Sequence, residues 1–146
     1  MPSAFKGDDA VLNRWWTIAQ FHEQPNKLIG ETWADLVPRS PPVFLYIEER
    51  SGILGMGLSS DALRKHSWAR LPRDEWLKVT MTMHWSQNAD GETRIAVDGH
   101  PEFADVIPGP NMYNAYKHYL KLGQYRHPAI TTGGDISYRA LTITKL

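Results

Sequence analysis

Apolar and polar residues alternate along several short stretches of the chain, most clearly in residues 75–86. Alternation with a period of two places the apolar side chains on one face of a β-strand, whereas a helix would scatter them around its circumference. The following residues, 88–92, contain an Asp-Gly pair, which is a strong hairpin signal. We therefore predict a strand, a tight turn and a second strand here. The apolar face of the first strand comprises Leu77, Val79, Met81, Met83 and Trp85.

Similar runs recur through the chain, separated by proline and glycine. Helical patterns are limited to single turns at 59–66 and 109–119. Seven or so short strands with closely spaced turn signals predict an all-β protein, an antiparallel β-sandwich or a concanavalin-like jelly roll. The 146 residues fit one domain, with residues 1–13 as an N-terminal arm. The predicted strands are 14–22, 43–49, 53–58, 75–86, 93–99, 119–125 and 136–146.

Composition narrows the classes of function. Sixteen basic residues balance sixteen acidic ones, so net charge gives no sign of a nucleic-acid or membrane partner, and we expect neither. The absence of cysteine excludes disulfides, thiolate metal sites and thiol nucleophiles. No apolar run approaches the roughly 18 residues of a membrane helix. Residues 1–13 lack the apolar core of a signal peptide, so we expect an intracellular protein or the mature form of an exported one.

Two predicted strands carry polar side chains of chemical interest. In residues 14–22, Gln20 and His22 share a face with Trp16 and Ile18. Gln20 and His22 are neighbours on that face, one pleat repeat or about 7 Å apart. An exposed polar pair on the outside of a sandwich would give the same pattern. In residues 119–125, one face carries two phenols, an ammonium group and a glycine between them: Tyr119, Lys121, Gly123 and Tyr125.

The second strand lies in a stretch without acidic residues, between Asp105 and Asp135. A locally positive surface in a protein of zero net charge favours an anionic ligand, although acids from neighbouring strands could also neutralise it. The basic and histidine residues in this stretch are Lys117, His118, Lys121, Arg126 and His127.

These residue types match the needs of β-elimination in a polymer of uronic acids. The reaction removes the proton beside the carboxylate, stabilises the resulting enolate and protonates the departing glycosidic oxygen. Lysine and glutamine bring N–H donors to a carboxylate, and a neutral histidine can accept the proton. A tyrosine near a cation can exchange protons with the substrate. Gly123 would leave room for a sugar ring.

Four stretches of the chain resemble the heparin lyase I type of polysaccharide lyase, a jelly-roll group that acts on polyuronates. The last of them, YLKLGQYR, resembles the Tyr-x-Lys-x-Gly-x-Tyr-Arg signature of that group, and the first contains its Gln-x-His pair. The four occur in the same order as in the group. They are residues 15–23, 71–86, 91–103 and 119–126.

The resemblance implies a role for each matching residue. His22 would be the catalytic base or part of the base system, and Tyr125 the acid that protonates the leaving oxygen; for one sugar epimer, Tyr125 could also be the base. Lys121 would steady the carboxylate or Tyr125, and Gln20 would help to neutralise the carboxylate. The resemblance implies no metal and no cofactor. Three further residues are expected to line the groove by shared face alone: Tyr119, Arg126 and His84.

The resemblance also bears on completeness and partners. Members of this group carry additional strands before the Gln-x-His strand, whereas 13 residues precede Arg14 here. We therefore expect a sandwich that is incomplete or completed by a second chain, and an unpaired strand would favour a homo-oligomer. The expected ligand is an anionic polysaccharide, and the implied location is secreted or periplasmic.

Two other functions remain open, and three are disfavoured. A sandwich that binds sugar without cleaving it would explain the six tryptophans and six tyrosines, and a structural part of a larger assembly would explain the short length. A glycoside hydrolase needs paired carboxylates, but the neighbouring Glu48 and Glu49 point to opposite faces. The six histidines lie far apart in sequence and form no HExxH motif, which disfavours a zinc enzyme. No glycine-rich loop opens a helix for nucleotide binding.

Overall fold

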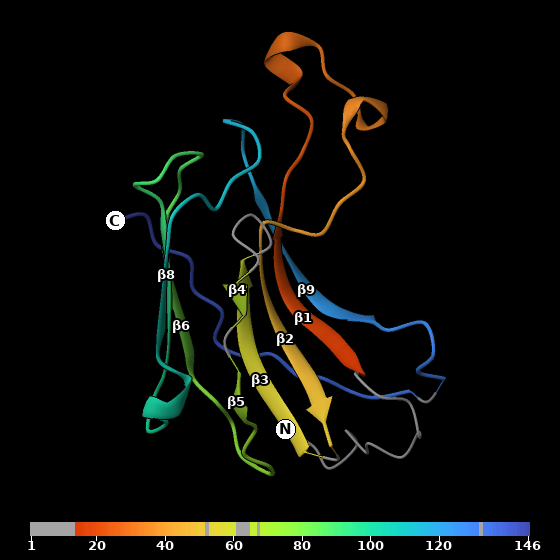
Figure 1. The fold of residues 1–146 in the computed structure, drawn as a ribbon, viewed down its shortest axis with the longest axis vertical. Helices are drawn as coiled ribbons and strands as arrows, with labels where there is room; N and C mark the ends of the chain where they lie inside the picture. The colour runs from red at the N-terminus through yellow and green to blue at the C-terminus, as the bar shows by residue number, and fades with distance from the viewer. Residues whose placement is uncertain (1–13, 52, 61–64, 67, 132) are drawn as a thin grey trace.

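The computed structural model describes residues 14–146 except 52, 61–64, 67 and 132 (Figure 1). The predicted N-terminal arm therefore lies outside the described residues. Within them, nine strands form two antiparallel sheets, and no α-helix occurs. The predictions of an all-β protein and of an antiparallel sandwich are confirmed.

The two sheets face each other as layers of unequal size (Figure 1). The large sheet has the order β4-β3-β2-β1-β9, with β5 also paired to β3, and the small sheet has the order β6-β7-β8. The large sheet contains β1 (Trp15–His22), β2 (Val43–Arg50), β3 (Ile53–Ser60), β4 (Lys65–His66), β5 (Ala69–Arg70) and β9 (Tyr119–Arg126). The small sheet contains β6 (Val79–His84), β7 (Glu92–Val97) and β8 (Asp105–Pro108). Three short 3-10 helices, η1 (Lys27–Ile29), η2 (Trp33–Asp35) and η3 (Pro101–Phe103), lie in connections.

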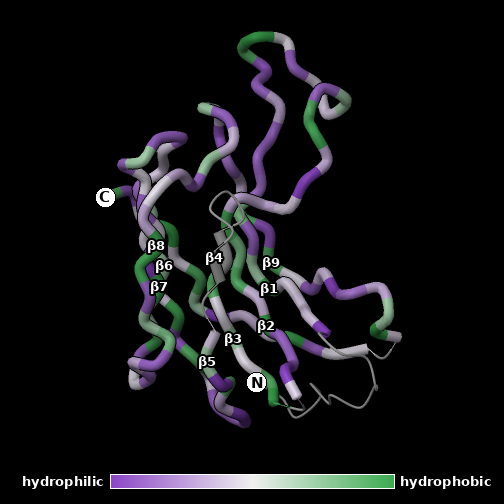
Figure 2. Tube along the Cα trace, in the orientation of Figure 1, coloured by the Kyte–Doolittle hydropathy of each residue, from purple (hydrophilic) through white to green (hydrophobic). Residues whose placement is uncertain are grey.

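The hydrophobic core fills the space between the sheets. In the large sheet, alternate residues of β2 and β3 face the core, because side chains two positions apart share a face. The apolar face predicted for 75–86 packs against this core from the small sheet. Figure 2 shows the hydrophobic stretches within the strands of both layers. The core residues of β2 and β3 are Val43, Leu45, Ile47, Leu54, Met56 and Leu58.

The predicted C-terminal strand does not form. Residues 133–146 contain no strand, and Ala140 has φ 53°, which interrupts an extended backbone. The segment is attached by side chains instead: Ile136 packs against the core, and the Arg139 guanidinium lies 4.1 Å from the ring of Trp76. It thus runs from the large sheet to the residues before β6.

The predicted helical turn at 109–119 is not seen. Residues 109–119 are irregular until β9 begins, and Asn111 is buried there because its side chain bonds the backbone around β6 and β7. In 59–66, the first and last two residues belong to strands, and 61–64 lie outside the described residues. The predicted hairpin at 88–92 is confirmed, since it joins β6 to β7.

Residues 23–42, between β1 and β2, project away from both sheets (Figure 1). We call them the β1–β2 excursion. They contain η1 and η2 and begin directly after His22, so they lie beside the polar end of β1.

Candidate functional site

Strand β1 changes face at Ile18. Thr17 pairs with Tyr46 of β2, but Ala19 pairs with the very next residue, Leu45, so Ile18 is an extra residue on β1. Such a bulge reverses the alternation beyond it. Gln20 and His22 therefore share the outer face of the large sheet with Trp15 and Thr17. The prediction that they share a face with Trp16 and Ile18 was wrong, because those two side chains are buried in the core.

The sheet brings the two polar strands together as direct neighbours. Gln20 pairs with Lys121 of β9, and His22 pairs with Tyr119. Cross-strand partners have Cβ atoms about 4.5–5.5 Å apart and point to the same face. Thr17 pairs with Tyr125, which therefore lies on this face as well. We call the surface formed by Gln20, His22, Tyr119, Lys121 and Tyr125 the β1–β9 face.

His22 and Tyr119 contact each other at one end of the β1–β9 face. Their ring centroids lie 5.9 Å apart, and Lys121 Nζ lies 5.1 Å from the centroid of Tyr119. His22 Nδ1 lies 2.7 Å from the main-chain oxygen of Glu23. A carbonyl oxygen can only accept, so Nδ1 carries the hydrogen. In the neutral imidazole, Nε2 then holds the lone pair and can accept a proton.

Tyr125 lies at the other end of the same face. Thr17, its partner, is five residues from His22, which corresponds to about 13 Å once the bulge is allowed for. The Tyr125 ring packs 5.6 Å from Trp15, and its side chain is 66% exposed. Its hydroxyl is thus open to a ligand but is not a neighbour of the His22 imidazole.

The outer face continues over β2 and β3. Tyr46 lies next to Thr17, and burial together with the charge of Glu48 raises the pKa of Tyr46 to about 12, so it stays protonated. On β3 this face carries Gly55 and Gly57 in place of larger side chains. A Cβ added at Gly55 would lie 1.9 Å from the Trp68 ring, so the glycine is required by the tryptophan that covers it.

Arg126 and His84 are not part of the β1–β9 face. Arg126 pairs with Trp16, whose side chain is buried in the core, so it lies on the other face of β9 from Tyr125. His84 belongs to β6 in the small sheet, where it is exposed and its Nδ1 lies 2.9 Å from the main-chain oxygen of Asp90. The other five predicted site residues are together on one face.

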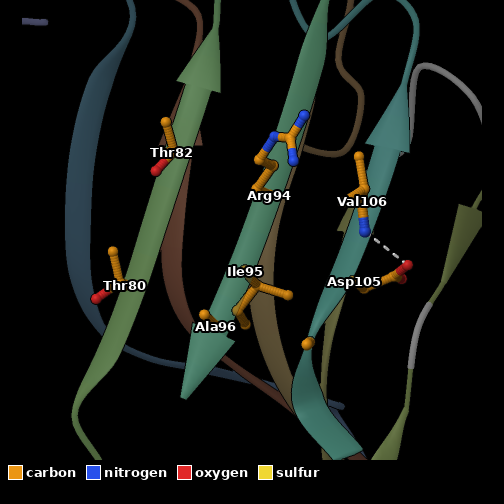
Figure 3. A pocket seen from close by; sticks show the side chains of 8 residues that line it. Thr80, Thr82, Arg94, Ile95, Ala96, Asp105 and Val106 are labelled. Atoms are coloured by element: carbon orange, nitrogen blue, oxygen red, sulfur yellow. Dashed lines mark hydrogen bonds between the residues drawn. The ribbon is translucent and has the colours of Figure 1, made fainter. Parts of the chain in front are cut away.

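A shallow hollow lies on the outer face of the small sheet, away from the β1–β9 face. Figure 3 shows Thr80 and Thr82 on β6 beside Arg94 on β7, with Asp105 accepting a hydrogen bond from the amide of Val106. The Arg94 guanidinium is paired with Glu92 within its own strand. The residues that line the hollow therefore lack the imidazole, phenols and ammonium group found together on β1 and β9.

Two residues that support His22 were not found from the sequence. Glu23 is 1% exposed, and its carboxylate accepts two hydrogen bonds from Arg39, at 2.8 and 2.7 Å. The Arg39 guanidinium also lies 3.7 Å from the ring centroid of Tyr113. The acid next to His22 was visible in the sequence, but its partner 16 residues away carried no signal.

A second histidine, His118, lies on the core side of the same strand end. Its ring stacks on Trp85 at 5.4 Å, and Nδ1 donates to the main-chain oxygen of Tyr116 at 3.1 Å. Within the described part of the chain, Nε2 is buried without a hydrogen-bond partner. Burial lowers the pKa of His118, which favours the neutral ring.

The described residues contain no group of three or more His, Cys, Asp or Glu side chains that could hold a metal ion. In the same part of the chain, no helix is long and apolar enough to span a membrane. The chemistry available on the β1–β9 face is that of an imidazole, two phenols, an ammonium group and an amide.

Fold and site together define a β-sandwich protein with a polar and aromatic face on its larger sheet. A family model described as Polysaccharide lyase matches residues 1–141, which is nearly the whole chain. The chain belongs to this polysaccharide lyase family, and lyase function in general is thereby supported. No curated protein and no solved structure matches the chain.

Proposed function

We propose that this protein cleaves a uronic-acid polysaccharide by metal-independent β-elimination, as a lyase of the heparin lyase I type. The observation that carries the proposal is the register of β1 and β9. It pairs Gln20 with Lys121 and His22 with Tyr119, so two carboxylate-binding groups lie beside an acid–base pair.

Gln20 and Lys121 match the negative charge of the substrate. A uronate carboxylate placed between Gln20 and Lys121 would receive N–H donors from both strands. As the neighbouring carbon loses its proton, negative charge grows on the carboxylate, and these donors then bind more strongly than in the ground state. Lys121 is exposed on this face and can reach such a ligand.

His22 is suited to remove the proton. The hydrogen bond from Nδ1 to the carbonyl of Glu23 fixes the tautomer and leaves Nε2 as the acceptor. The electron pair of the broken C–H bond moves into the enolate, then forms the new C=C bond as the glycosidic C–O bond breaks. A phenol of β9 gives its proton to the departing oxygen, so the proton count balances.

Two phenols are candidates for that acid, and their positions differ. Tyr125 occupies the signature position, whereas Tyr119 contacts both His22 and Lys121. Acid and base serve atoms two bonds apart on the sugar, which favours Tyr119 by position, while the exposed hydroxyl of Tyr125 would require a sugar that spans the face. The two Tyr→Phe variants decide between them.

The test is incubation with alginate, glucuronan and heparin-type polymers while recording the ultraviolet absorbance of the unsaturated product. The expected result is activity on at least one polymer, lost by 10²-fold or more in His22→Gln, a magnitude of the order found for general acid–base groups. Tyr119→Phe and Tyr125→Phe are measured in the same way. The phenol whose replacement lowers kcat by a factor similar to that of His22→Gln is the acid. His100→Gln, in the small-sheet region, is the matched control. Folded protein without activity on any of the polymers would overturn the proposal.

A further inference from the structure

The β1–β2 excursion places an exposed tryptophan next to the β1–β9 face. The side chain of Trp33, in η2, is 59% exposed, and its ring lies 6.4 Å from that of Tyr119 at an interplanar angle of 81°. Tyr119 in turn contacts His22. The indole thus borders the end of the face where the imidazole lies.

This tryptophan is held in place before any ligand binds. Thr32, directly before it, donates from its amide and its hydroxyl to the Asp35 carboxylate, at 2.7 and 2.8 Å. These bonds lower the pKa of Asp35, so the carboxylate stays charged and η2 stays capped. At the base of the excursion, the Arg39–Glu23 pair ties it to the end of β1. A fixed aromatic ring binds with a smaller loss of conformational entropy than a mobile one.

We propose that Trp33 forms a subsite for the polysaccharide, stacking the sugar ring next to the one whose carboxylate meets Gln20 and Lys121. The inference rests on the proposed function for its substrate class, a polyuronate. Pyranose rings present C–H groups on their faces, and an exposed indole offers them an apolar, electron-rich surface. The indole is inclined at 81° to the Tyr119 ring and stays 59% exposed, so part of its surface is open beside the reacting position. Trp33 is then a determinant of affinity for longer chains.

The excursion supplies its own matched control. Ile29, in η1, is 71% exposed, and like Trp33 it belongs to the projecting segment seen in Figure 2. Ile29 has no aromatic ring, so it takes no part in the ring contacts that link Trp33, Tyr119 and His22. A substitution of Ile29 therefore shows the effect of losing any exposed apolar side chain from the excursion, and Trp33→Ala shows the effect of losing the indole.

The experiment measures KM and kcat for glucuronan and alginate oligomers from dimer to octamer. Trp33→Ala is expected to raise KM for the longer oligomers about 5- to 30-fold, the range for removing an aromatic side chain from a binding site, with kcat nearly unchanged. The effect should vanish at the shortest oligomer that is cleaved. Trp33→Phe should recover most of the affinity, and Ile29→Ser should match the parent protein.

Two outcomes would overturn the inference: equal KM values for Trp33→Ala and the parent at every length, or an equal loss in Ile29→Ser. If the parent cleaves nothing, the proposed function fails, and calorimetric binding of the same oligomers still tests the subsite. Tighter binding by the parent than by Trp33→Ala would then support the subsite. No difference in binding between the two proteins would overturn it.

Discussion

The hydroxyl of Tyr138 accepts a hydrogen bond from the amide of Gly123, at 3.2 Å, although the two residues lie in different segments. The same hydroxyl donates to the carbonyl of Ile18 and also lies 3.0 Å from that of Gly123. The Tyr138 hydroxyl therefore lies at the irregularity in the pairing of β1 with β9, between the pairs Thr17–Tyr125 and Ala19–Leu122. Gly123 has φ 150°, a conformation that favours glycine, so the signature glycine serves the backbone here.

This contact should stabilise both the fold and the spacing of the site. Tyr138→Phe removes the hydroxyl and leaves the Ile18 carbonyl and the Gly123 amide without this partner. We expect the free energy of unfolding to fall by about 1–2 kcal/mol, the typical cost of losing one partner of a partly buried hydrogen bond. Urea denaturation at pH 7 measures it. Turnover should fall with little change in KM, because Gly123 lies between Lys121 and Tyr125.

Tyr116→Phe is the control, since the Tyr116 hydroxyl takes part in none of these bonds. It should unfold at the urea concentration of the parent protein. If Tyr138→Phe proved as stable as Tyr116→Phe, the hydroxyl would have no structural role at the irregularity.

The same part of β1 shows how much of the site could be predicted from the sequence. The chemistry of Gln20, His22 and Lys121 could be predicted from residue types, and the structure does make their strands neighbours. The face that β1 presents was predicted wrongly, because a strict period of two was assumed, whereas the consecutive apolar residues Ile18 and Ala19 break the alternation at the bulge. Tertiary packing decides where the extra residue is absorbed. The buried Ile18 and the Tyr138 hydroxyl on its carbonyl are both products of that packing.

In the C-terminal segment, the sequence predicted a strand that the structure does not contain. Residues 136–146 alternate as a strand would, yet none of the described strands pairs with them. A β-pattern needs a partner strand before its hydrogen bonds can form, and sequence alone does not supply one. Here Tyr138 and Arg139 make side-chain contacts with the large sheet and with Trp76 instead.

The Glu23–Arg39 pair should stabilise the fold far more than an exposed ion pair. Glu23 has 2% and Arg39 36% side-chain exposure, so removing the arginine leaves a nearly buried carboxylate without its charge partner. Arg39→Ala should lower the free energy of unfolding by about 2–4 kcal/mol, somewhat reduced from a fully buried pair by solvent at the arginine. It should also reduce turnover, because the carbonyl of Glu23 orients His22. Urea denaturation and initial rates measure the two effects.

Lys78→Ala provides the comparison for an exposed pair. Lys78 Nζ lies 2.8 Å from Asp98, but the side chains are 76% and 61% exposed. Solvent screens an exposed pair and its contribution to stability is small, so this variant should be nearly as stable as the parent. Glu23→Gln combined with Arg39→Met should recover part of the loss, since no buried charge remains. Equal stabilities of Arg39→Ala and Lys78→Ala would show that burial of Glu23 does not matter.

His118 should make the protein less stable in mild acid. Burial lowers the pKa of His118 below its ordinary value of 6.5, with smaller opposing contributions from the Tyr116 carbonyl and Glu23, whereas His22 and Arg39 lower it further. As the pH falls through about 6.5, the unfolded chain takes up a proton at this residue while the folded protein does not. The contribution of His118 to the free energy of unfolding therefore decreases until the pH is below the folded pKa, and it then stays at the lower value. The drop in Tm between pH 7 and pH 5 should be smaller in His118→Gln than in the parent.

His100 gives a control of opposite sign. Glu102, and then Glu75, raise the pKa of His100, so its contribution to stability is fully present below about pH 6.5 and is lost as the pH rises through the folded pKa. Acid therefore strengthens the His100 interactions while it weakens the fold through His118. His100→Gln should show a larger drop in Tm between pH 7 and pH 5 than the parent does. If both variants changed the drop in the same direction, the pH dependence would arise from groups other than these two histidines.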